Sequence, residues 1–137
     1  MRPVLRLDRE ALDEFVALAY ECYPEEACGL IAGPADRPDD AIRFYRCRNA
    51  AASARVYTID PRDHLRAEDD ADDHGWLING VVHSHTHSEP YPSPTDVTQA
   101  PDPTWHYVIV SLKREVPEVR SYRIVDGVIA EESIEIG

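Results

Sequence analysis

Apolar residues near the N-terminus follow the period of an α-helix. Phe15, Ala19 and Cys22 lie three or four positions apart, so they share one helix face. Asp8 precedes the pattern as an N-cap acceptor, and Pro24 cannot continue a helix. We therefore predict an amphipathic helix between Asp8 and Pro24.

A sheet is predicted by segments that are apolar throughout or that alternate apolar and polar residues. Residues 28–33 form a short apolar run bounded by glycine and proline, which is typical of a buried strand. Residues 76–85 are also dense in apolar side chains, which favours a buried strand there. The further predicted strands are rich in β-favouring residues and lie at 42–48, 55–60, 105–112, 119–125 and 128–136, with a hairpin turn at Asp126-Gly127.

Two more helices and a loop complete the pattern. Asp60 followed by Pro61 is typical of a helix start. Three prolines without periodicity predict a loop over residues 86–94, and Ser93 precedes a short helical segment at 94–100. This order of helices and strands predicts an α+β domain with α/β/α layers, in which a mixed β-sheet is flanked by helices.

Composition narrows the function classes. At 137 residues, with 43% hydrophobic and 29% charged residues, the chain fits a single domain over residues 1–137. Its formal net charge of −12 would be repelled by nucleic acid and by anionic membrane surfaces, which argues against both partners. No segment approaches the roughly 20 apolar residues of a membrane span, and no cleavable leader pattern is present, so we expect a cytoplasmic protein. Three cysteines without a CxxC pair favour a reducing compartment.

A histidine pair and an aspartate carry the candidate metal chemistry. His83 and His85 are two residues apart at the end of a predicted strand, so both imidazoles project from one face and can share an ion. Asp96, in the first turn of the short helix, adds a carboxylate oxygen of the kind that zinc binds. Three protein ligands leave a fourth position for water, as in catalytic zinc sites. The spacing therefore predicts a hydrolytic zinc site.

Such a site also needs a carboxylate that moves protons. Glu26 is our candidate, because it lies beside an apolar stretch where partial desolvation raises the pKa of a carboxyl group; Glu25 is the rival by position alone. Ser93 offers a hydroxyl that can stabilise an oxyanion, although it equally suits a helix N-cap. The Cys28 thiol is an alternative nucleophile, but its place at the start of a buried strand favours core packing.

Together these residues match a known pattern. Glu26, the pair His83 and His85, then Ser93 and Asp96 occupy every signature position of the JAMM (MPN+) zinc metallopeptidase motif, which this sequence resembles. The resemblance implies the JAMM/MPN fold, which is similar to that of cytidine deaminase, and one catalytic zinc held by the two histidines and the aspartate. It also gives the general acid/base role to Glu26 and leaves Glu25 as its neighbour.

The resemblance extends over nearly the whole chain and is strongest to a short bacterial branch of the family. It implies a ubiquitin-like sulfur carrier protein as substrate, with hydrolysis of the amide bond after its C-terminal Gly-Gly and release of cysteine or a short peptide for cysteine biosynthesis or sulfur transfer. The alternative is a non-catalytic MPN interaction module, which the intact ligand set argues against. A homodimer is compatible with the sequence. The similarity along the chain includes residues 49–51, 57–60, 91–96 and 121–127, and the closer resemblance to the bacterial branch is carried by residues 83–86, 91–93 and 121–127.

Overall fold

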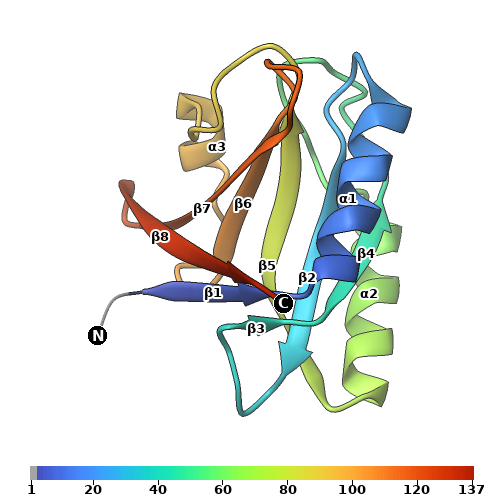
Figure 1. Cartoon of the computed structure of the whole chain (residues 1–137). Coiled ribbons are helices and arrows are strands. Elements are labelled where there is room, and N and C mark those ends of the chain that lie inside the picture. The colour runs from blue at the N-terminus through green and yellow to red at the C-terminus, as the bar shows by residue number, and fades with distance from the viewer. Residues whose placement is uncertain (1–2) are drawn as a thin grey trace.

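A mixed β-sheet of eight strands forms the centre of the molecule (Figure 1). The computed structural model describes residues 3–137; Met1 and Arg2, which the predicted domain includes, lie outside the described residues. The strand order is β3-β1-β8-β7-β6-β5-β2-β4. The strand bounds are β1 Val4–Leu7, β2 Cys28–Pro34, β3 Asp40–Ala41, β4 Arg43–Cys47, β5 Trp76–His85, β6 His106–Ser111, β7 Glu118–Val125 and β8 Val128–Ile136.

Three helices begin at the caps that the sequence predicts. The Asp8 side chain accepts a hydrogen bond from the backbone N–H of Ala11 and starts α1 (Arg9–Cys22), while Asp60 caps α2 (Pro61–Asp73) in the same way. Ser93 caps the short helix α3 (Pro94–Thr98). Within residues 3–137, none of the helices has both the length and the apolar character that crossing a bilayer requires.

The helices cover opposite faces of the sheet, which confirms the predicted α/β/α layers. Ile31 of β2 and Val82 of β5 pack into a core with α1, whereas their neighbours Leu30 and Val81 pack into a second core with α2. This division follows from the two-residue period of side chains along a strand. His83 and His85 continue the series of Val81, so both project toward the α2 side.

The pairing of β5 positions the end of that strand. β5 runs antiparallel to β2 and parallel to β6, and Cys28 of β2 lies opposite His83. The residues just before β2 therefore lie beside the last residues of β5. This register brings Glu26 and His85, which are distant in sequence, to the same end of the sheet.

The structure corrects the sequence analysis in two places. The strand predicted at residues 55–60 is wrong, because this segment forms only an isolated bridge between Ile59 and Asn49. The Asn49 side chain bonds to the backbone of this segment at Val56 and Thr58, in place of a neighbouring strand. The short strands β1 and β3 were not predicted; β1 pairs in parallel with both β3 and β8, and these strands cross the direction of the central ones (Figure 1).

Candidate metal site and catalytic carboxylate

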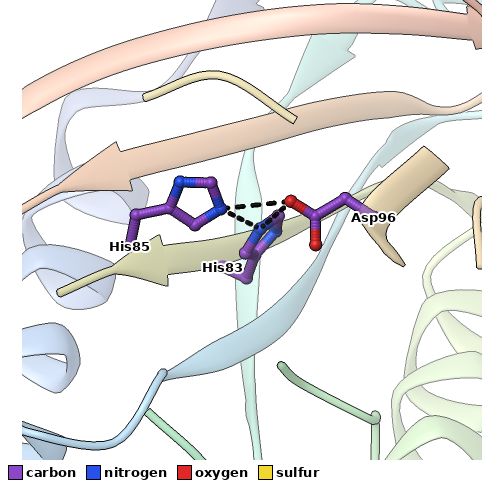
Figure 2. Close-up of side chains that lie close together, drawn as sticks. All are labelled: His83, His85 and Asp96. Carbon is purple, nitrogen blue, oxygen red and sulfur yellow. Dashed lines mark hydrogen bonds and ion pairs between the residues drawn. The ribbon is translucent and has the colours of Figure 1, made fainter. Parts of the chain in front are cut away.

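His83, His85 and Asp96 converge on one point at the end of β5 (Figure 2). The Nε2 atom of His83 lies 3.2 Å from His85 Nε2 and 3.2 Å from Asp96 Oδ2, and His85 Nε2 lies 3.1 Å from the same oxygen. All three side chains are buried, with 2%, 4% and 6% of their surface exposed. The three predicted ligands are therefore brought together, with one ligand atom each.

The triangle of ligand atoms has the dimensions of a zinc site. Zinc lies roughly 2.0–2.1 Å from nitrogen and oxygen ligands, so two ligands of a tetrahedral ion are about 3.3–3.4 Å apart. The observed separations of 3.1–3.2 Å are close to this value. Two imidazoles and one carboxylate are also the donor types of catalytic zinc sites. The residues present therefore fit the metal.

A backbone carbonyl sets the orientation of His85. The Nδ1 atom of His85 lies 2.8 Å from the carbonyl oxygen of Glu89, so Nδ1 carries a proton, and in the neutral imidazole Nε2 would offer its lone pair to a metal. The Glu89 carboxylate in turn accepts hydrogen bonds from Lys113 and Arg114. Burial disfavours the charged form of His85, but the hydrogen bonds to Asp96 and to the Glu89 carbonyl, with the negative charges of Asp96 and Glu26, together outweigh it and raise the pKa. Sequence reasoning missed Glu89, because a carbonyl contact leaves no residue signature.

His83 is enclosed more completely. The Tyr57 ring stacks on its imidazole, with ring centroids 4.2 Å apart and an interplanar angle of 21°. Burial lowers the pKa of His83, which favours the neutral imidazole that can bind a metal. Its Nδ1 atom has no hydrogen-bond partner among the described residues. Tyr57, which the sequence analysis placed in a strand, is thus a wall of the site.

Asp96 is held by the first turn of α3. Its Oδ2 atom accepts a hydrogen bond from the backbone N–H of Ser93, while Ser93 Oγ accepts one from the backbone N–H of Asp96. This reciprocal pair is a capping box. Burial opposes ionisation of Asp96, but hydrogen bonds from His83 and His85 outweigh it and hold the pKa well below its usual range. The carboxylate is therefore anionic and aimed at the two histidines.

Glu26 and Glu25 occupy different environments. Glu26 is 4% exposed, whereas Glu25 is exposed to solvent. Burial raises the pKa of Glu26 to about 8, with His85 opposing the shift and Asp96 adding to it. The Oε1 atom of Glu26 has no hydrogen-bond partner among residues 3–137. Of the two adjacent glutamates, only Glu26 is buried at the metal site with an oxygen left to bind water.

Hydrogen bonds hold the backbone around Glu26 in place. Its N–H donates to the carbonyl of Ser53, and its carbonyl accepts a hydrogen bond of 3.1 Å from Asn49 Nδ2. On the opposite face of β5, Ser84 Oγ accepts a 2.8 Å hydrogen bond from the N–H of Ala27. Cys28 is fully buried in the core and burial raises the pKa of its thiol, in line with the packing role preferred above.

Comparison with known proteins identifies the family. Residues 8–125 match the model of the prokaryotic homologues of the JAB domain. The CysO-cysteine peptidase of Mycobacterium tuberculosis is 42% identical to this chain, over 97% of the chain and 91% of that protein. The desampylase of Haloferax volcanii is 35% identical over 78% of this chain and 80% of its own length.

A solved structure supports the same assignment. Protein DSY2949 from Desulfitobacterium hafniense superposes with a TM-score of 0.85 at 34% identity, covering 98% of this chain and 93% of the other. The fold and the resemblance inferred from the metal motif are thus confirmed. The chain belongs to the prokaryotic JAB-domain family and is a peptidase.

Proposed function

We propose that this protein is a zinc-dependent peptidase that hydrolyses the amide bond after the C-terminal Gly-Gly of a ubiquitin-like sulfur carrier protein, releasing cysteine or a short peptide. The observation that carries the proposal is the buried group of His83, His85 and Asp96 with the Glu26 carboxylate beside it. The substrate class is supported by the two relatives, a CysO-cysteine peptidase and a desampylase.

The chain supplies a proton carrier for this reaction. Bound zinc supplies Lewis-acid chemistry that makes a water molecule acidic at neutral pH. Glu26 accepts the proton that the attacking water loses and returns it to the amine nitrogen as the C–N bond breaks. One water is consumed, and the products are a carboxylate and a free amine. The raised pKa of Glu26 suits both halves of this transfer.

Ser93 is proposed to stabilise the oxyanion. Its Oγ accepts a hydrogen bond from Asp96, and its own O–H proton has no acceptor among the described residues, so it can be donated to substrate. We expect Ser93→Ala to lower kcat by roughly 10²-fold or more without loss of zinc. Steady-state kinetics and metal analysis test this, with Ser88→Ala from the same loop as the control. Near-normal turnover would leave Ser93 as a helix cap alone.

The proposed reaction can be tested directly. A ubiquitin-like carrier protein extended beyond Gly-Gly by one cysteine should lose that residue, which mass spectrometry detects as a shorter carrier. The activity should require zinc, be lost on treatment with a chelator and return when zinc is restored. The non-catalytic alternative predicts that the protein purifies without stoichiometric zinc and leaves the adduct intact. That result would refute the proposal.

A further inference from the structure

A polar cleft adjoins the candidate site on the side of Glu26. Its volume is about 520 Å³, and it is formed between the ends of α1, β4 and α2. Glu26 lines the cleft together with three arginines, Arg46, Arg48 and Arg66. The lining also includes Glu25 and Asp63, so three arginines and three acidic residues share the cleft.

The arginines are not equivalent. Arg46 is paired with Glu21 at 3.1 Å and Arg66 with Asp63 at 2.6 Å. The Arg48 side chain forms no ion pair or hydrogen bond among residues 3–137; its backbone N–H donates to the Asp63 carboxylate and its carbonyl accepts from the N–H of Asp60. Of the three arginines of the cleft, Arg48 is therefore the one whose guanidinium has no direct partner within the described residues, and it is exposed.

The position of Arg48 is tied to that of Glu26. Arg48 directly follows Cys47, which lies opposite Cys28 in the β2–β4 pairing. The next residue, Asn49, donates a hydrogen bond to the carbonyl of Glu26. Strand pairing and the Asn49 hydrogen bond therefore link the backbone segments that carry Arg48 and Glu26.

The proposed reaction places the departing group in this cleft. A residue that returns a proton to the leaving amine must lie within hydrogen-bond reach of that nitrogen, about 2.6–3.2 Å. In a released amino acid the carbon of the α-carboxylate is two bonds away from the nitrogen. The carboxylate would therefore lie close to the side of the cleft that Glu26 lines. When the released amine is the side chain of a lysine, by contrast, the nitrogen is followed by four methylene groups, and no carboxylate lies next to it. A carboxylate is also the group that a guanidinium binds best, through two parallel hydrogen bonds.

We infer that Arg48 is a specificity-determining residue that binds the free α-carboxylate of the departing C-terminal residue. This inference rests on the proposed function and deepens it: the enzyme removes a terminal amino acid in preference to an amide-blocked residue or a lysine side chain. Arg48 acts on the leaving group and leaves the metal site unchanged.

Two adducts of one ubiquitin-like carrier test the inference. In the first, alanine follows the Gly-Gly tail; in the second, alanine amide does. Alanine replaces cysteine so that no thiol competes for zinc. We expect the wild-type protein to cleave the acid with a kcat/KM about 10- to 100-fold above that for the amide, the range of a charge-assisted hydrogen bond.

Substitution at Arg48 should remove this preference. Arg48→Gln should lower kcat/KM for the acid by the same factor and leave the amide unchanged, while Arg48→Lys keeps part of the preference. Arg62→Gln is the matched control, because Arg62 is exposed, carries the same charge and does not line the cleft. Equal loss on both adducts in Arg48→Gln, or equal wild-type rates on both, would overturn the inference alone. A wild-type protein that cleaves neither adduct would overturn the proposed function and the inference with it.

Discussion

We expect Glu26→Gln to lower kcat by about 10²-fold or more while zinc stays bound. Glutamine keeps the shape of the side chain but cannot take a proton from water or return one to an amine. The Glu26 carboxylate is buried and its Oε1 atom is unpartnered within the described residues, so the substitution removes no hydrogen bond at that oxygen. Steady-state kinetics on a carrier adduct, together with the zinc content of the purified variant, measure the effect.

Glu25→Gln is the natural control for this experiment. Glu25 adjoins Glu26 in sequence but is exposed, so its substitution should be nearly silent. The comparison separates a proton carrier from a general effect of negative charge near the metal. Full zinc-dependent activity in Glu26→Gln, or an equal loss in both variants, would contradict the mechanism.

Asp96→Asn is expected to abolish activity by removing zinc. The substitution replaces an anionic ligand by a neutral amide in a group whose other members are two histidines, which bind a metal as neutral imidazoles. The new amide oxygen can still accept the hydrogen bond from Ser93, so the cap of α3 is kept. Loss of an outer partner of a metal ligand weakens binding about 10- to 100-fold, and loss of a ligand itself should exceed this. Metal analysis after dialysis and an activity assay with added zinc test the prediction.

The thermal stability of the same proteins gives a second readout. Zinc that binds only the folded state should raise the Tm of the wild-type protein, and Asp96→Asn should lose most of this rise. Asp36→Asn is a suitable control, because Asp36 is exposed and lies outside the metal group. Stoichiometric zinc in dialysed Asp96→Asn would show that another residue completes the site.

Local signals account for the elements that the sequence predicts. Asp8 and Asp60 cap the two long helices as their sequence contexts indicate, and the apolar run of β5 forms a buried central strand. β1 has four residues and β3 has two, and both depend on parallel pairing with partners far along the chain. Such strands carry no local signal, because their stability comes from tertiary contacts.

The candidate site also has features that the sequence predicts and features that depend on tertiary structure. The convergence of His83, His85 and Asp96 follows from strand parity and from the spacing of a known motif, so it could be predicted. The burial of Glu26 beside His85 depends on the β2–β5 register, which position in the sequence does not reveal. The contact of Glu89 with His85 is made by a main-chain carbonyl, and Tyr57 lies in an irregular segment that resembles a strand.

The pairing of β2 with β5 limits where residues can be inserted into or deleted from this chain. Cys28 lies opposite His83, and the bond between Ala27 and Ser84 locks the neighbouring position. Because side chains alternate along a strand, inserting or deleting one residue between Glu26 and Cys28 would turn Glu26 toward α1, away from the histidines. We therefore expect insertions and deletions compatible with hydrolysis to be confined to the loops, because the spacing between Glu26 and β2 sets the geometry of the candidate site as much as its side chains do.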